Sequence, residues 1–543
     1  MRKAFDTEVD VVIVGAGFAG LYLLYRLRQL GMTAQVLEMG DGVGGTWYWN
    51  RYPGARCDAE SLAYSFSFSP ELEQQWHWSE RYATQPEILA YAEHVADHFD
   101  LRRDIAFKQK VTSALYDQGH NEWHVLTEQG LEVRARFCVM ATGCLSVPQL
   151  PDIPGVADFK GPRYQASLWP PEGVDFTGQR VGIIGTGSSG IQAIPKIAEQ
   201  AAHLTVFQRT PNFSVPAVNK PLDQDWVEQF KHHYREHRRY HKLGLSSGFG
   251  DLDIEPVERT PVAETAQGMS AEQVAELLDP YWERGGAFFL SAFADTMMNP
   301  ATNALVAEYV RNKIRATVKD PEVAEKLCPT NHPIGTKRIC VDTGYYETYN
   351  RENVTLVDVA ADPIEAITAT GLRTGTKSYE FDVLVLATGF DAMTGALGRM
   401  DIRGEDGQRL KDKWAHGPRS YLGLSIAGFP NFFTVTGPGS PSVLSNMMVS
   451  IEQHVDWIVD CMQHMRHSGY KRIEAQPSAE DQWVNHVNDV ASATLFPLAG
   501  SWYMGANVEG KPRVFMPYAA GVGPYREVCD DVVADDYRGF DFM

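Results

Sequence analysis

The alternation of apolar and polar segments near the N-terminus predicts a strand, a helix and a second strand. Residues 9–38 read VDVVIVGAGFAGLYLLYRLRQLGMTAQVLE. A continuous β-branched run comes first, followed by a glycine-rich turn, an amphipathic helix and another apolar strand, which together are typical of one βαβ unit. The pattern recurs over residues 179–210, QRVGIIGTGSSGIQAIPKIAEQAAHLTVFQRT. We therefore expect two parallel βαβ units in one chain.

Three glycines mark the turn of the first unit. Gly15, Gly17 and Gly20 stand in G-x-G-x-x-G spacing. They allow a tight turn and a close approach of the backbone to a pyrophosphate, and the unpaired N–H groups of the helix N-terminus favour its negative charge. Glu38 closes the second strand, where a carboxylate can accept hydrogen bonds from ribose hydroxyls. Because both flanking elements accompany the glycines, the first unit predicts a bound dinucleotide.

The second unit repeats the glycine spacing but differs at the end of its second strand. Gly185, Gly187 and Gly190 form the turn, and the strand ends in Gln208 and Arg209 where the first unit has its acid. A carboxylate would repel a 2′-phosphate, whereas a guanidinium binds it. Arg209 as a merely solvated strand-end charge is the alternative. We expect FAD in the first unit and NADPH in the second.

Two later segments indicate how the chain returns between these units. FCVMATG (137–143) and YEFDVLVLATGFD (379–391) are buried strands that end in Ala-Thr-Gly, as in flavoproteins with two dinucleotides, which the chain resembles. Residues 217–330 are charged and helix-forming. We expect an α/β fold of two Rossmann-like dinucleotide-binding domains, for FAD and NADPH, with a helical insertion. The expected boundaries are 1–145 and 387–543 for the FAD domain, 146–216 and 331–386 for the NADPH domain, and 217–330 for the insertion.

Composition excludes several classes of partner. The 543 residues carry a formal net charge of −20, which repels nucleic acid and anionic membrane surfaces. No apolar run approaches the length of a bilayer span, and no signal-peptide core precedes the first strand, so a cytoplasmic protein is expected. The seven cysteines nowhere form CxxC. We expect reduced, mostly structural thiols, no metal and a monomer.

One histidine pattern imitates a metal site. His233, His237 and His241 stand four residues apart within KHHYREHRRYHK (231–242). Cationic residues share the same segment and oppose metal binding, so a solvated helical face is the favoured interpretation.

Two other chemistries lack their context. GLSSG (244–248) matches the G-x-S-x-G of hydrolases, but no strand precedes it and its neighbourhood is basic and helical. A disulfide reductase needs a redox-active cysteine pair near the flavin, and Cys138 and Cys144, which lie across a strand and its turn, are the nearest approach.

Two longer patterns point to one family. GGTWYWNRYPGARCD (44–58) completes the fingerprint G-G-x-W-x-x-x-x-Y-P-G-x-x-x-D, and FKGPRYQASLWP (159–170) follows F-x-G-x-x-x-H-x-x-x-W-P except at Gln165, where the fingerprint has His. The chain resembles the Baeyer–Villiger monooxygenases, class B flavoprotein monooxygenases, and within them the phenylacetone and steroid monooxygenase branch. The resemblance runs from the first glycine turn to SWYMGANVEGKPRVFMPY (501–518).

The resemblance implies roles for individual residues. It makes Arg338 the arginine that stabilises the peroxyflavin anion, and Asp58 the carboxylate that pairs with it. NADPH contacts are implied for Ser188, Ser189, Gln192, Arg209, Thr210, Lys337 and Trp502 beside the three glycines of the second turn. FAD contacts are implied for Thr46, Trp47, Trp49, Tyr64 and Val111, and a substrate pocket for Ser442, Val443, Leu444 and Met447.

The implied reaction is the NADPH- and O2-dependent conversion of ketones to esters or lactones through a C4a-peroxyflavin, with sulfoxidation as a side activity. Trp169 and Pro170 favour the ketone branch. The alternatives are another class B monooxygenase acting on nitrogen or sulfur, and a weakly active NADPH oxidase or flavin redox module. Gln165 motivates the second alternative, because glutamine can donate and accept hydrogen bonds but cannot titrate.

Overall fold

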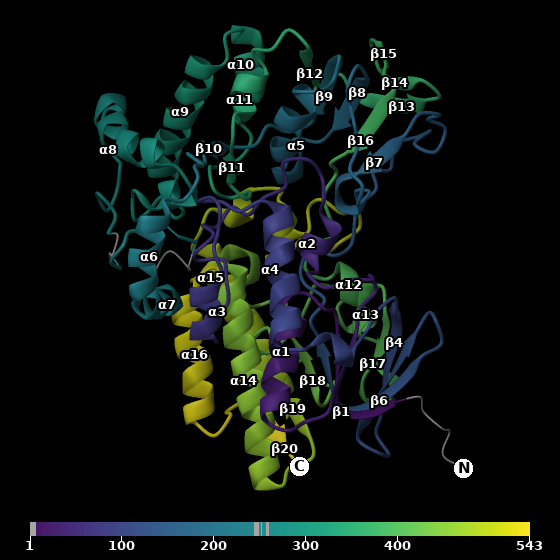
Figure 1. The fold of residues 1–543 in the computed structure, drawn as a ribbon. Helices are drawn as coiled ribbons and strands as arrows, with labels where there is room; N and C mark the ends of the chain where they lie inside the picture. The colour runs from purple at the N-terminus through teal and green to yellow at the C-terminus, as the bar shows by residue number, and fades with distance from the viewer. Residues whose placement is uncertain (1–6, 244–248, 251, 257–259) are drawn as a thin grey trace.

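The computed structural model describes residues 7–243, 249–250, 252–256 and 260–543. Its two main sheets lie in separate halves of the molecule, one above the other in Figure 1. The fold is α/β with two dinucleotide-type domains, as expected. No helix within the described ranges is both long and apolar enough to cross a membrane.

The lower half is built on a mixed sheet with strand order β17-β4-β5-β6-β1-β2-β3, to which β18 adds beside β6. Strand β1 runs parallel to both neighbours, Val14 pairing with Leu37 on β2 and with Met140 on β6. The bounds are β1 (Thr7–Val14), β2 (Ala34–Leu37), β3 (Ile105–Ala106), β4 (Val111–Asp117), β5 (Glu122–Thr127), β6 (Glu132–Met140), β17 (Asp401–Arg403) and β18 (Phe432–Thr434). Because β17 and β18 come from residues beyond 400, the C-terminal part of the chain completes the N-terminal sheet.

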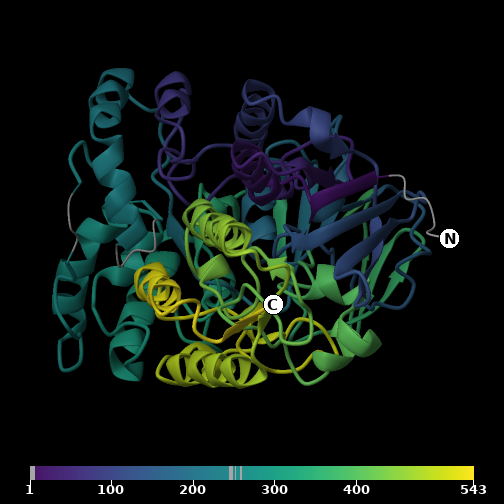
Figure 2. The same cartoon turned by 90° about the horizontal axis from the view of Figure 1, so that it is seen from below.

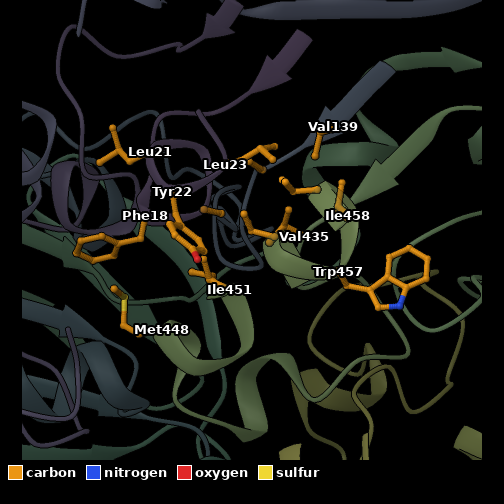
Figure 3. Packing of buried hydrophobic residues seen from close by; sticks show 14 of the residues in the cluster. Phe18, Leu21, Tyr22, Leu23, Val139, Val435, Met448, Ile451, Trp457 and Ile458 are labelled. Carbon is orange, nitrogen blue, oxygen red and sulfur yellow. The ribbon is translucent and has the colours of Figure 1, made fainter. Parts of the chain in front are cut away.

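The helix α1 (Phe18–Gln29) packs between this sheet and the long helix α14 (Met447–Ser468). Figure 3 shows Leu21, Leu23 and Val139 of the first part of the chain in the same cluster as Ile451 and Ile458 of α14. Buried apolar contacts of this kind supply most of the stabilisation of a domain. The other helices of this half are α2 (Thr46–Trp49), α3 (Pro70–Gln75), α4 (Gln85–His98), α12 (Gly395–Gly398), α13 (Leu410–Lys413), α15 (Pro477–Ser492) and α16 (Val522–Ala534).

The upper half is built on a parallel sheet with strand order β12-β9-β8-β16-β7. Helix α5 (Ser188–Ala198) connects β8 to β9, so this is the second βαβ unit expected from the sequence. The bounds are β7 (Arg163–Gln165), β8 (Arg180–Ile184), β9 (His203–Gln208), β12 (Val354–Asp358) and β16 (Val383–Leu386). An antiparallel sheet of β13 (Ile364–Thr368), β14 (Gly371–Thr374) and β15 (Ser378–Glu380) packs near it.

Helices occupy most of the segment between the two parts of the upper half. They are α6 (Gln224–His232), α7 (Tyr234–Leu243), α8 (Ala271–Arg284), α9 (Pro300–Thr317) and α10 (Pro321–Leu327), and α11 (Tyr345–Thr348) follows them. Strands β10 (Ser214–Pro216) and β11 (Cys340–Asp342) pair where the chain leaves and re-enters the upper half, and β19 (Ile473–Ala475) pairs with β20 (Phe540–Phe542) near the C-terminus. Seen from below, the helices between residues 224 and 327 form one side of the molecule (Figure 2). The domain boundaries expected from the sequence remain a prediction.

Candidate active site

The first glycine turn packs against the backbone that follows strand β6. Gly15 has φ of 106°, a conformation that favours glycine, and a Cβ there would lie 2.6 Å from the carbonyl oxygen of Ala141. A Cβ on Gly20 would collide with the carbonyl oxygen of Gly15. Gly17 precedes α1 directly, so the helix N-terminus faces the turn. The turn therefore has the shape that a pyrophosphate requires.

Glu38 lies at the end of β2 beside this turn and is buried. Its carboxylate accepts hydrogen bonds from the backbone N–H groups of Ala16, at 2.8 Å, and Gly40, at 2.7 Å. Burial raises the pKa of Glu38, while the hydrogen bonds from these two amides act in the opposite direction. The carboxylate is thus fixed in position at the edge where the sequence places the ribose.

The second turn reproduces the first at equivalent positions. Gly185 has φ of 112°, and a Cβ there would collide with the carbonyl oxygen of Ala387, while a Cβ on Gly190 would collide with the oxygen of Gly185. Gly187 has open space around its missing Cβ. Ser188 and Ser189 begin α5, so their amides face that space. The two Ala-Thr-Gly segments therefore pack against the two glycine turns, the first through Ala141 and the second through Ala387.

Cations gather beside the second turn. Burial lowers the pKa of Lys337, and the nearby positive charge of Arg209 lowers it further. In the described part of the chain no ion pair engages either residue. Gln208 is buried and its side chain donates to the carbonyl oxygen of Lys326 at 2.7 Å, which a carboxylate could not do. Thr210 follows Arg209, and its carbonyl oxygen accepts from Thr186. Two unneutralised cations in proximity form an anion site.

The residues expected along the flavin line the region beyond the first turn. The Trp47 indole donates to the Tyr64 hydroxyl at 3.1 Å, and their rings meet edge to face. Thr46 and Trp49 are the first and last residues of α2, and Thr46 is exposed. Val111 begins β4 in the same buried cluster as the last residues of β1 and β2. Trp47 and Tyr64 thus contact each other in one buried cluster, and Val111 belongs to another.

Arg338 stands where the two halves meet. Its Nε and Nη2 donate to the two carboxylate oxygens of Asp58, each at 2.9 Å, and its Nη1 donates to the carbonyl oxygen of Val443 at 2.5 Å. Burial alone lowers the pKa of Arg338, but the Asp58 carboxylate outweighs this effect and leaves the pKa raised. The guanidinium also lies over the Phe249 ring, 4.8 Å from its centroid. The result is a permanently charged, oriented cation.

The segment expected to shape the substrate pocket has a constrained backbone. Ser442 is fully buried and has φ of 43°, a left-handed conformation that is uncommon for a residue other than glycine. Its hydroxyl lies 2.9 Å from the Sγ of Cys144. Val443 is buried, whereas Leu444 and Met447 are partly exposed. The carbonyl oxygen of Val443 thus contacts Arg338, whereas the side chains of Leu444 and Met447 remain partly exposed.

Gln192 connects the two halves. Its Oε1 accepts from the Tyr52 hydroxyl at 2.8 Å, and its Nε2 donates to the carbonyl oxygen of Arg56 at 3.1 Å. Gly54 fits only as glycine, because it has φ of 82° and a Cβ would collide with the carbonyl oxygen of Gln192. The structure therefore uses Gln192 as a domain contact, a feature that the sequence did not indicate.

Trp502 and its neighbours close the site from the C-terminal side. Trp502 is partly exposed and packs against Tyr503, with ring centroids 4.3 Å apart. Tyr503 is buried, and its hydroxyl interacts with Arg338. Lys511 donates to the Asp391 carboxylate at 2.8 Å and to the carbonyl oxygen of Ala392 at 2.6 Å. Tyr503 and Lys511 were missed from the sequence, because nothing in their spacing indicates a partner so distant in the chain.

Gln165, which replaces the fingerprint histidine, ends β7 and pairs with Leu386 of β16. Its Nε2 is buried and makes no hydrogen bond among the described residues. The next residue after Leu386 is Ala387, the back of the second nucleotide turn. The substitution thus leaves an unsatisfied donor one strand from the expected NADPH site.

The histidine pattern is not a solvated face, so that interpretation was wrong. His237 and His241 are both 2% exposed, and His237 stacks on Phe230 and lies 3.1 Å from the carbonyl oxygen of residue 254. Burial lowers the pKa of His241 to about 3. The helix turns its histidines inward as neutral rings, and the described residues include no cluster of side chains suited to a metal. The hydrolase-like segment 244–248 lies outside the described residues.

The cysteines carry no redox pair. All seven are free and buried, and burial raises the pKa of Cys138 and of Cys144. A thiol of this kind is poorly nucleophilic.

Comparisons with known proteins agree on one group of enzymes. Residues 12–247 match the family described as pyridine nucleotide-disulphide oxidoreductase. A Baeyer–Villiger monooxygenase of Pseudooceanicola batsensis is 42% identical over 98% of this chain and 96% of its own length. A phenazine N-monooxygenase of Lysobacter antibioticus is 38% identical, with coverage of 98% and 97%.

Solved structures match over the whole chain. An oxidised steroid monooxygenase bound to NADP has a TM-score of 0.93 and 51% identity, covering 99% of this chain and 100% of that one. Cyclohexanone monooxygenase of Rhodococcus sp. Phi1 bound to NADP+ has a TM-score of 0.94 and 42% identity, covering 99% of each chain.

Proposed function

The chain belongs to the Baeyer–Villiger monooxygenase family, and from this premise we propose that Arg338 and Asp58 form its oxygenation site. The protein is an FAD- and NADPH-dependent oxidoreductase that oxidises ketones with O2. When bound, the two cofactors supply the hydride and the activation of oxygen. The observation that carries the assignment is the position of Arg338, held at once by Asp58 and by the Val443 carbonyl.

The two glycine turns fit the two cofactors. Each turn leaves room where a side chain would block the approach of a pyrophosphate, and each opens onto a helix N-terminus. We assign FAD to the turn with Glu38, because its fixed carboxylate suits ribose hydroxyls. We assign NADPH to the turn with Arg209 and Lys337, because these two cations suit a 2′-phosphate.

Arg338 provides a positive charge that persists at any working pH, since its pKa is raised by Asp58. A fixed cation stabilises negative charge on reacting oxygens without the reorganisation that water would need. The bidentate contact with Asp58 orients the guanidinium, and the buried side chains of Val443 and Tyr503 shield part of it from water. Leu444 and Met447 offer the apolar contacts for a ketone.

The test compares Arg338→Ala and Arg338→Lys with the unaltered holoenzyme. We expect both variants to retain FAD and NADPH binding, and ester formation to fall by about 100-fold or more in Arg338→Ala. NADPH oxidation, ester and hydrogen peroxide are quantified in the same reaction with a cyclic or arylalkyl ketone. Full ester yield from Arg338→Ala would refute the assigned role.

Oxygenation of nitrogen or sulfur is a second candidate, favoured by the similarity to a phenazine N-monooxygenase. Competition between a ketone, a thioether and an aromatic amine, measured as kcat/KM for each, decides between the candidates. Ketone preference supports the first function, with sulfoxidation as a side activity. A third candidate, a weakly active NADPH oxidase, requires stoichiometric peroxide from every substrate, and Gln165 is the residue that motivates it.

We further propose a monomer in the cytoplasm that binds neither membranes nor nucleic acid. The buried free thiols suit a reducing compartment. The net charge of −20 repels both anionic membrane surfaces and nucleic acid. Light scattering of the purified holoenzyme tests the monomer, and a mass near twice 60.6 kDa would reject it.

A further inference from the structure

A cavity of about 720 Å³ lies between helices α3, α6, α7 and α16. These helices come together in the lower left of Figure 1, away from the glycine turns. The chain as a whole is strongly acidic, yet the lining of this cavity is basic and holds a single carboxylate, Glu73. The basic residues are Lys231, Arg235, Arg238, Arg239, Lys242 and Arg526. We refer to these six residues as the basic lining.

Two members of the basic lining are occupied by protein groups. The Lys231 ammonium is buried and donates to the carbonyl oxygen of Gln74 at 2.8 Å. Arg238 is buried, pairs with the Glu73 carboxylate at 2.7 Å and donates to the carbonyl oxygen of Ala63 at 3.2 Å. Glu73 is therefore already neutralised. These residues build the cavity wall and leave no negative charge in it.

The remaining members have charges that the protein does not satisfy. Arg526 has Nε and Nη2 atoms that are buried and make no hydrogen bond in the described structure. Asp530 lies one turn away on α16, and no ion pair joins the two side chains in the part of the chain that the structure describes. Burial lowers the pKa of Arg526 and of Lys242. A buried donor left unpaired is costly, so the two Arg526 donors lack an acceptor that a ligand can provide. Lys242 is half-buried in the same lining and forms no ion pair with any described residue.

A carboxylate outside the lining, Glu452, favours the charged forms of Arg526 and Lys242 but forms no ion pair with either among the described residues. Glu452 on α14 is buried and accepts hydrogen bonds from the backbone N–H of Ser67, at 2.5 Å, and from the Ser67 hydroxyl. Arg235 and Arg239 are exposed on α7, and within the described ranges neither forms an ion pair. Among the described residues, Arg526 and Lys242 are thus cations without an ion pair inside the cavity, and Arg235 and Arg239 are cations without an ion pair at its mouth.

Phosphate oxygens fit this arrangement best. Guanidinium groups bind phosphate through two parallel hydrogen bonds, and several cations around one cavity select a ligand with more than one negative charge. The volume lies in the range that holds a small molecule and is too small for a polymer. We propose that this cavity is a binding site for a small, soluble phosphorylated compound, bound by Arg526 and Lys242 with Arg235 and Arg239 at the entrance.

This site is separate from the NADPH site, because Arg209 and Lys337 belong to the upper half and none of the basic lining does. The test uses inorganic pyrophosphate as the probe. It is titrated by calorimetry into the holoenzyme with FAD bound and NADP+ saturating, so that the second glycine turn is occupied. Sodium chloride keeps the ionic strength constant.

We expect one saturable site in the unaltered protein. Arg526→Gln and Lys242→Gln should each weaken binding about tenfold or more, which corresponds to the loss of a charge-assisted hydrogen bond. Arg373→Gln is the matched control, because it removes the same charge from the exposed position of strand β14 and should leave the affinity unchanged. FAD content and the midpoint of thermal unfolding are measured for every variant.

Absence of saturable binding, or unchanged affinity in Arg526→Gln and Lys242→Gln, would overturn the proposal. If Arg526→Gln does not fold, the exposed Arg235→Gln variant decides together with Lys242→Gln. Phosphatidylcholine vesicles containing phosphatidic acid form a parallel arm. Binding to these vesicles without binding of pyrophosphate would show that the site takes the phosphate group of a lipid. That result would overturn the proposal of a soluble ligand.

Discussion

Asp58 and Arg338 come from opposite halves of the molecule and meet in a bidentate ion pair, with both N···O distances at 2.9 Å. The side chains are 27% and 22% exposed, so the pair is shielded but not sealed. A pair of this kind stabilises the contact between the halves and holds the guanidinium in one orientation.

Asp58→Asn is therefore expected to loosen Arg338 while sparing its charge. The ratio of ester to hydrogen peroxide should fall by about tenfold, since the variant loses one charge-assisted contact. Asp382→Asn is the matched control, because Asp382 forms the same type of pair with Arg180 on the surface. Equal product ratios in the two variants would contradict the role of Asp58.

Arg209→Ala tests the anion site beside the second turn. The KM for NADPH should rise about 10- to 100-fold, whereas the KM for NADH should stay within about twofold, because only NADPH carries the 2′-phosphate. Steady-state kinetics with both coenzymes measure this. A parallel rise for both coenzymes would show that Arg209 acts on the fold and not on the phosphate.

Gln165→His restores the fingerprint residue at a position where the glutamine Nε2 has no partner. Because imidazole titrates near neutrality and an amide does not, the variant should change both the ratio of ester to peroxide and its dependence on pH. The ratio is measured from about pH 6 to about pH 9. Gln200→His, on an exposed turn after α5 in the same half, serves as control. An unchanged ratio across this range would exclude a role for residue 165 in coupling.

Asp391→Asn removes the negative charge that pairs with Lys511. The segment of residues 499–512 should then be cleaved several-fold faster by a dilute protease, because its attachment to residues 390–392 is weakened. The KM for NADPH should rise with it, since Trp502 lies in the segment. Glu199→Gln breaks an exposed lysine pair on α5 and is the control. Identical cleavage rates would show that this contact does not hold the segment.

His454 makes stability depend on pH. It is fully buried, accepts a hydrogen bond from the Thr436 amide at 2.8 Å, and burial lowers its pKa to about 3. The unfolded chain binds a proton below about pH 6.5 and the folded chain does not, so stability is lost as the pH falls through this window.

Because of His454, the free energy of unfolding is expected to fall by about 2 kcal/mol between about pH 7 and about pH 5. His454→Asn keeps an acceptor in place and should remove this part of the loss, measured by urea unfolding at both pH values. His467→Asn, an exposed substitution on the same helix, should leave the loss unchanged. An equal loss of unfolding free energy between the two pH values in His454→Asn and in the unaltered protein would contradict this role of His454.

The sequence predicted the parts of the fold that rest on local pattern. The two βαβ units follow from apolar periodicity and from glycines whose missing side chains are required by contacts with Ala141 and Ala387. Arg338 and Asp58 were identified only through the resemblance to the family, because they stand 280 positions apart in the chain and nothing local indicates that they pair.

Other features could not be inferred from residue types. His237 and His241 were expected in solvent, since cations share their helix, but tertiary packing turns them inward and gathers the cations around a cavity. The contacts of Gln192, Tyr503 and Lys511 join segments far apart in the chain and have no local signal.

The two Ala-Thr-Gly segments also mark where the chain crosses between the two halves. The chain leaves the lower half just after Ala141 and returns from the upper half just after Ala387, and each time it passes a glycine with positive φ, Gly143 at 69° and Gly389 at 81°. Each alanine stays against its own nucleotide turn. Just past these glycines the two connections are hydrogen-bonded to each other, because the Gln149 amide donates to the Gly389 carbonyl oxygen and the Asp391 amide to that of Val147, each at 2.9 Å. The two crossings therefore form one paired connection between the halves.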